Sequence, residues 1–133
     1  MTRGLLDTST LILLGRVSNV SALPDEPLIS SVTLAELSVG PLVAATDEER
    51  AARQAHLQLA EADFQALPFD DVAARAFGAV AASLRAAGRK PTARSYDAMI
   101  AAIAIANDLP LYTCNPRDFD GIAGLRVIRV DFE

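Results

Sequence analysis

Short apolar segments alternate with longer amphipathic segments along the whole chain. Apolar runs of strand length occupy residues 3–7, 27–31, 66–69, 109–113 and 126–130. Helical patterns lie between them, at residues 8–14, 33–41, 46–64, 70–87 and 95–106. Because strands alternate with helices, we expect an α/β fold with a small central parallel sheet flanked by helices. No repeat, low-complexity tract or linker divides the chain, so we expect one domain over residues 1–133.

Capping residues and breakers mark the ends of the expected helices. Thr8, Ser9 and Thr10 are N-cap residues ahead of residues 11–14. Residues 33–36 and 46–49 have the capping-box pattern, and Ser95 is the expected cap of the last helix. The Gly40–Pro41 pair disturbs the second helix, and Gly88 ends the fourth.

Composition narrows the class of protein. Hydrophobic residues make up 51% of the 133 residues, enough for one core without a disulfide or metal to hold it together. The single cysteine excludes an internal disulfide and a multi-cysteine metal site. Asp7 comes too early for the apolar part of a signal peptide, and the apolar run 98–106 is too short to span a bilayer. We therefore expect a cytoplasmic protein that does not bind membranes.

Charge is unevenly distributed along the chain. The net charge of −5 argues against a general nucleic-acid coat protein. Residues 47–71 hold seven acids and two bases, whereas residues 72–96 hold five bases and no acid. The basic segment either binds phosphate groups or is a solvated surface. The candidates for such phosphate contacts are Arg85, Arg89, Lys90 and Arg94.

Acidic residues follow several of the expected strands. Ligands of open α/β sheets bind outside the carboxyl ends of the strands. Asp7 ends the first strand, Glu36 lies in the helix after the second, and Asp97 lies in the first turn of the last helix. Asp118 and Asp120 follow the fourth strand. The sequence therefore predicts that acids from separate segments meet at one edge of the sheet.

Clustered carboxylates repel one another unless cations neutralise them, and Mg²⁺ or Mn²⁺ prefers such oxygen ligands. An ion held there could generate a hydroxide nucleophile and stabilise the leaving oxygen of a phosphodiester. Each acid also has a simpler interpretation: Asp7, Glu36 and Asp97 could stabilise helix N-termini, and Asp118 and Asp120 could be turn residues. Capping, however, does not require the acids to converge.

The sequence gives little support to catalytic chemistry other than that of clustered carboxylates. We expect His56 to be a surface residue in the middle of a helix and Cys114 to be an unreactive thiol beside a buried strand. No Gly-rich phosphate loop of either standard spacing occurs. A haloacid-dehalogenase phosphatase would need Asp-x-Asp after the first strand, where Ser9 stands here, and a receiver domain would need a late lysine in a context that Lys90 does not have.

Four short motifs occur in an order that resembles the PIN-domain ribonucleases, specifically the VapC toxins of VapBC toxin–antitoxin pairs. They are Leu-Leu-Asp-Thr-Ser at residues 5–9, Ser31 with Glu36, Tyr-Asp-x-x-Ile-Ala at residues 96–101, and Thr-x-Asn-x-x-Asp-Phe at residues 113–119. The resemblance covers residues 4 to about 130. It implies a PIN-like domain and metal-dependent endonucleolytic cleavage of RNA, leaving 5′-phosphate and 3′-hydroxyl ends.

The same resemblance assigns residues and partners. It implies that the catalytic and metal-binding acids are Asp7, Glu36, Asp97 and Asp118, with Asp120 as an alternative fourth acid. It implies that Ser9, Thr113 and Asn115 are supporting polar residues. The implied cofactor is one or two Mg²⁺ or Mn²⁺ ions, and the implied partners are an RNA substrate, a VapB-type antitoxin and a second copy of the chain. The competing hypothesis is a catalytically inactive PIN-fold protein that only binds a partner.

Apolar residues in the first two helices suggest where an antitoxin helix would bind. Residues 11–14 together with Leu34, Leu37 and Leu42 exceed what a thin pair of helices needs to bury. The alternative is that these leucines pack on the sheet. The sequence does not name the RNA target.

Overall fold

Five parallel strands form the centre of the molecule. The computed structural model describes residues 1–90 and 94–133. In these residues the sheet has the order β3-β2-β1-β4-β5, and every strand pair is parallel. The strands are β1 (Arg3–Leu6), β2 (Glu26–Ser30), β3 (Ala66–Leu67), β4 (Leu111–Thr113) and β5 (Val127–Arg129). The expected fold class is confirmed.

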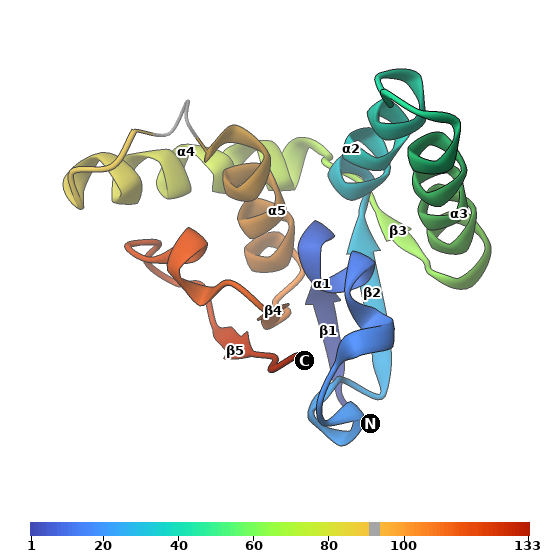
Figure 1. Ribbon diagram of the computed structural model, residues 1–133. Helices are drawn as coiled ribbons and strands as arrows, with labels where there is room; N and C mark the ends of the chain where they lie inside the picture. The colour runs from blue at the N-terminus through green and yellow to red at the C-terminus, as the bar shows by residue number, and fades with distance from the viewer. Residues whose placement is uncertain (91–93) are drawn as a thin grey trace.

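Helices cover both faces of this sheet (Figure 1). They are α1 (Thr8–Ile12), α2 (Ser31–Leu42), α3 (Asp47–Asp63), α4 (Asp71–Ala86) and α5 (Ser95–Ala106). Short 3-10 turns are η1 (Leu14–Arg16), η2 (Val20–Ala22) and η4 (Pro116–Phe119). The helix α5 runs antiparallel to the strands, so it begins at the edge of the sheet where the strands end (Figure 1).

Alternate strand residues enter two separate cores because successive side chains of a strand point to opposite faces. Leu5, Leu28 and Leu111 pack with the buried residues of α4 and α5. Their neighbours Leu6, Ile29 and Tyr112 pack on the other side, with Leu11 of α1, Leu37 of α2 and Ala60 of α3. Near-continuous apolar strands are typical of a parallel sheet covered on both faces.

Three helices begin differently from the sequence prediction. Asp7, and not residues 8–10, is the N-cap of α1, and its side chain accepts the Thr10 amide. The prediction of a capping box at residues 33–36 is wrong, because Ser30 is the N-cap of α2 and its side chain accepts the Thr33 amide at 3.0 Å. This earlier start leaves Glu36 free of a capping role. Arg94, and not Ser95, is the N-cap of α5, without a side-chain capping bond.

Other expected boundaries are confirmed or shift slightly. Thr46 caps α3 and Asp70 caps α4. Gly88 follows α4 with a φ of +76°, a conformation that glycine adopts without strain. The pair Gly40–Pro41 lies inside α2, which ends directly afterwards at Leu42. The strands β3, β4 and β5 are shorter than expected, and prolines without an amide donor border two of them, Pro68 after β3 and Pro110 before β4.

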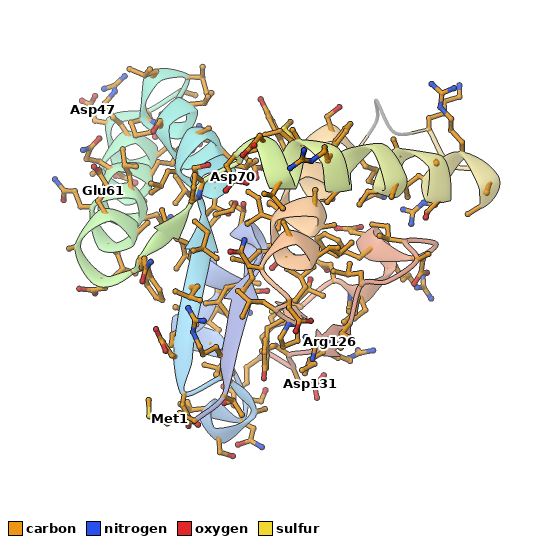
Figure 2. The ribbon with its side chains drawn as sticks, turned by 180° about the vertical axis from the view of Figure 1, so that it is seen from behind. Met1, Asp47, Glu61, Asp70, Arg126 and Asp131 are labelled. Carbon is orange, nitrogen blue, oxygen red and sulfur yellow. The ribbon has the colours of Figure 1, made fainter. Side chains whose placement is uncertain are left out.

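The acidic segment of residues 47–71 lies on α3 and the start of α4. Asp47, Glu61 and Asp70 are exposed, and Figure 2 shows the first two on the outer side of α3. All seven acids of this segment are exposed to solvent. No helix in residues 1–90 and 94–133 is long and apolar enough to cross a membrane.

The strand order reverses direction at β1. From β1 the chain continues outward to β2 and β3, then returns to the other side of β1 with β4 and β5. A reversal of this kind leaves a crevice at the carboxyl ends of the strands, which is the usual ligand site of open α/β sheets. In this sheet the switch point lies between β1 and β4.

Candidate active site

Four carboxylates lie near the carboxyl ends of the strands. Asp7 follows β1, Glu36 lies in α2 after β2, Asp97 lies in the first turn of α5, and Asp118 lies in η4 after β4. The charges of Asp118, Asp7 and Glu36 all act on Asp97. We call these four residues the acid rim. The structure thus places the four predicted acids near enough for their charges to interact, although not around a single point in the described residues.

Asp7 is almost fully buried and is held by four hydrogen bonds. Its side chain is 3% exposed. The oxygen Oδ1 accepts from the backbone amide of Thr10 at 3.1 Å and from the Thr10 hydroxyl. The oxygen Oδ2 accepts from the Thr113 hydroxyl at 2.7 Å and the Ser9 hydroxyl at 3.3 Å. These bonds fix the orientation of a carboxylate that an apolar core would otherwise exclude.

The predicted supporting residues form one hydrogen-bonded group around Asp7. The Asn115 side-chain amide donates to the Ser9 hydroxyl at 3.2 Å, and the Asn115 backbone amide donates to the Thr113 hydroxyl at 2.9 Å. Sequence analysis missed the role of Thr10, which is fully buried and accepts the Cys114 amide at 3.0 Å. Its position three residues after a strand-end acid is the signal that could have identified it.

A second threonine holds Glu36. The Thr8 hydroxyl donates to Glu36 Oε1 at 2.7 Å and lies 3.0 Å from the Thr33 hydroxyl. Burial raises the pKa of Glu36, the bond from Thr8 lowers it, and the charge of Asp7 raises it further. Glu36 is therefore oriented by α1 although it belongs to α2. Sequence analysis did not assign Thr8 this role.

Asp97 is the acid whose ionisation is most clearly perturbed. Burial, and then the charges of Asp118, Asp7 and Glu36, raise its pKa to about 6, while Arg94 lowers it. Like charges at close range disfavour the ionised form. A raised pKa of this origin is typical of functional sites, where carboxylates share one small volume.

Arg94 supplies a positive charge within the acid rim. Its Nη1 lies 2.5 Å from Asp118 Oδ1 and 3.7 Å from Asp97 Oδ2. Asp118 thus faces the rim, whereas the exposed Asp120 accepts a bond from Arg89 through its backbone carbonyl. This placement favours Asp118 over Asp120 as the fourth acid.

The predicted RNA-contacting bases differ in their surroundings. Arg85 and Lys90 are exposed near the end of α4. Arg89 is half-buried, and its Nη1 donates to the carbonyl oxygens of Arg117 and Asp120. Arg94 is paired with acids, as above. Arg89 and Arg94 thus have intramolecular partners that the sequence did not indicate, and residues 91–93 between them lie outside the described part of the chain.

The donor set suits a hard divalent cation, although the carboxylates are not drawn together around one point. Among the described residues, no three histidine, cysteine or acidic side chains are close enough to hold a metal ion as they stand. The Arg94 guanidinium lies between Asp97 and Asp118, so these two acids are neutralised by a side chain. The oxygen-only chemistry fits Mg²⁺ or Mn²⁺.

Comparison with known proteins identifies the family. Residues 5–125 match the family model of the PIN domain. The chain is 42% identical over 132 residues to ribonuclease VapC5 of Mycobacterium tuberculosis, covering 96% of this chain and 95% of that protein. The chain belongs to the VapC branch of the PIN-domain family.

Solved structures agree with this assignment. The crystal structure of VapBC-5, a VapBC-family toxin–antitoxin system from M. tuberculosis, matches with a TM-score of 0.84 and 39% identity, covering 98% of this chain and 100% of that one. The structure of DNA-bound VapBC from Salmonella typhimurium matches with a TM-score of 0.72 and 28% identity, covering 97% and 98%.

Two residues set aside by the sequence analysis have defined positions in this VapC-family chain. Cys114 is buried directly after β4, and burial raises the pKa of its thiol, as expected for an unreactive cysteine. His56 departs from the expectation of a surface residue: it is half-buried and lines a cavity that also contains Glu36.

Proposed function

We propose that this VapC-family ribonuclease toxin cleaves RNA phosphodiester bonds with Mg²⁺ or Mn²⁺ held by the acid rim, Asp7, Glu36, Asp97 and Asp118. The observation that carries this proposal is the placement of the four acids after β1, β2 and β4 and at the start of α5, near enough for the charges of Asp118, Asp7 and Glu36 to act on Asp97. Acids from four separate segments influence one another at the switch point of the sheet, where helix capping alone would not require them to meet.

The residues of the rim divide into fixed and adjustable groups. Asp7 and Glu36 are held by hydroxyl groups of α1 and β4 before any ligand arrives, which provides preorganised oxygen ligands. Asp97 and Asp118 are each paired with Arg94, as described above. In the described part of the chain, these two acids are thus held by an ion pair, whereas Asp7 and Glu36 are held by hydroxyl groups.

When bound, the divalent ion would neutralise the carboxylates and promote attack of water on a phosphodiester. The chain itself would orient the ligands through Thr8, Thr10 and Thr113, and exclude water from Asp7 by burial. Ser9 and Asn115 extend this hydrogen-bonded support to the surface of the site. The exposed Arg85 and Lys90 would contact RNA phosphates beside the rim.

The partners proposed are a VapB-type antitoxin and a second copy of the chain. The two solved structures described above are of VapBC toxin–antitoxin systems. Ile12 of α1 is 40% exposed and Leu42 at the end of α2 is 85% exposed, which leaves apolar surface for an antitoxin helix. Leu11 and Leu37 are buried in the core, so they are not part of that surface.

Cleavage of RNA by purified variants tests the catalytic proposal. We expect Asp7→Asn and Asp97→Asn each to lower the rate on the order of 100–1,000-fold, because each removes an electrostatic contact to the reacting centre. Asp63→Asn, an exposed acid at the end of α3, is the matched control and should retain wild-type activity. Near-wild-type cleavage by Asp7→Asn would contradict the proposal and favour a protein that only binds partners.

Co-expression tests the antitoxin. We expect a small protein encoded beside this gene to co-purify with the chain and to inhibit RNA cleavage. If no neighbouring product binds, and induction of the chain alone is harmless, the role as a toxin is refuted even though the fold stands.

A further inference from the structure

A small cavity opens beside Glu36, and we call it the side pocket. It has a volume of about 220 Å³ and lies where α1, α2 and α3 meet. Two of its walls, Thr8 and Glu36, are the pair joined by the 2.7 Å hydrogen bond of the acid rim. The remaining lining residues are Ile12, Leu37, Gly40, Arg53 and His56. The side pocket is therefore continuous with the proposed catalytic centre.

The side pocket combines apolar walls with two planar nitrogen-bearing groups. Ile12 and Leu37 provide the apolar walls, and the aliphatic part of Arg53 packs against Gly40. Arg53 and His56 are one turn apart on α3, so both side chains lie on the same face of that helix. The Arg53 guanidinium is fixed by a bond from Nη1 to the Gly40 carbonyl at 2.9 Å.

We propose that the side pocket binds one base of the RNA substrate, next to the phosphate that is cleaved; this rests on the proposed ribonuclease function. Its volume is below the roughly 300–1,000 Å³ of pockets for drug-sized ligands, which suits a single ring system. Proteins bind unstacked RNA bases between aromatic or guanidinium planes and hydrogen-bond their edges. Arg53 and His56 are side chains of these two kinds.

The opposite side of the acid rim has different chemistry. A second cavity beside Asp118, of about 350 Å³, is lined by Asn115, Arg117 and Arg129 among others. Its arginines suit a phosphate, whereas the apolar walls of the side pocket do not. An antitoxin helix would need a groove for a row of side chains at i, i+3, i+4 and i+7, which a cavity for one ring does not provide.

Binding can be measured without catalysis because His56 is the single histidine of the chain. The Asp7→Asn protein, in which cleavage is blocked, would be titrated with four trinucleotides that differ only in one base. We expect the ¹H and ¹⁵N chemical shifts of the His56 imidazole to change on addition of at least one of the four trinucleotides, and not on addition of an abasic trinucleotide. Equal shifts with the abasic control, no shift at all, or a shift only with the antitoxin would overturn the proposal.

A cleavage experiment separates the side pocket from the ribonuclease function. We expect His56→Ala to reduce the wild-type preference for a base over an abasic site at this position about 5- to 100-fold, the range that loss of one base-stacking contact gives. Gln58→Ala, an exposed residue of the same helix, should leave the preference unchanged. Cleavage with an unaltered preference in His56→Ala refutes the side pocket alone, whereas His56 shifts without any cleavage by the wild-type protein refute the ribonuclease function alone.

Discussion

At the scale of single residues, the ionisation of Asp97 links the site to stability. Its pKa is raised from 3.8 to about 6, so between these values the folded chain binds more protons than the unfolded chain. The free energy of unfolding contributed by this group therefore falls as pH rises from about 4 to 6, and levels off above. At neutral pH, the charged Asp97 side chain lowers the free energy of unfolding by on the order of 1–3 kcal/mol.

We expect metal-free Asp97→Asn to melt at a higher temperature than the wild-type protein at pH 7.5, with the difference shrinking at pH 5. The amide removes the buried negative charge at high pH, whereas at low pH the wild-type carboxyl is already neutral. Thermal melts in chelator at both pH values measure this. A difference that does not change with pH would contradict the assigned cause.

Arg94 leads to a second prediction at this scale. Its guanidinium neutralises Asp97 and Asp118 in the described structure. Arg94→Gln should lower the melting temperature of the metal-free protein and raise its affinity for Mn²⁺ several-fold, because an internal competitor for the acids is removed. Calorimetric Mn²⁺ titration provides the affinity, and Arg85→Gln is the exposed control. Unchanged or weaker Mn²⁺ binding would show that Arg94 does not compete with the ion.

Sequence analysis identified the acids of the rim and, through the family resemblance, the supporting residues Ser9, Thr113 and Asn115, but it missed Thr8 and Thr10. Strand-end positions of Asp7 and Asp118 follow from the alternation of elements, and the four acids meet as expected. The bond from Thr8 to Glu36 joins α1 to α2 and is a tertiary contact without a local pattern, whereas the bond from Thr10 to Asp7 is local and follows from their spacing of three residues. The sequence did not predict that His56 is half-buried, because most residues that line the cavity with it belong to α1 and α2, which are distant in sequence.

At the scale of elements, the close contact of β1 with β4 depends on Gly4. A Cβ at this position would lie 2.2 Å from Cε1 of Tyr112, whose side chain is 6% exposed. Gly4→Ala should therefore lower the free energy of unfolding by about 1–3 kcal/mol, the usual cost of overpacking. Chemical denaturation measures it.

The control for that prediction is Gly78→Ala, in the middle of α4, where an added Cβ meets no atom within 4 Å. It should stabilise the protein by about 0.5–1 kcal/mol, because alanine favours helix. Equal effects of the two substitutions would show that Tyr112 does not restrict this position.

Element existence and order were predictable, whereas helix starts were not. Capping patterns repeat within a few residues: Ser30 and Thr33 are both capping residue types, and the end of the buried strand β2 makes Ser30 the cap. The prediction of Thr33 as a cap gave Glu36 a local role, which its bond to Thr8 replaces. Tertiary packing decided between two locally equivalent patterns.

At the scale of the whole molecule, an acidic protein must bind a polyanion through a local surface. Reversal of Arg85 and Lys90 to glutamate should weaken RNA binding evenly across sequences and flatten its dependence on salt, because fewer counterions are released. The control is the reversal of Arg3 and Arg126, which lie next to the amino ends of β1 and β5, opposite the acid rim. Binding titrations at several salt concentrations measure the slope. An unchanged slope would leave residues 72–96 as a solvated surface.

The central claim is that the acid rim holds a divalent cation, and anomalous diffraction from crystals containing Mn²⁺ tests it most directly. The account predicts an anomalous peak within coordinating distance of Asp7 and at least one of Glu36, Asp97 and Asp118, and loss of that peak in Asp7→Asn crystals. A peak elsewhere on the molecule, or none at Mn²⁺ concentrations that support RNA cleavage, would contradict the account.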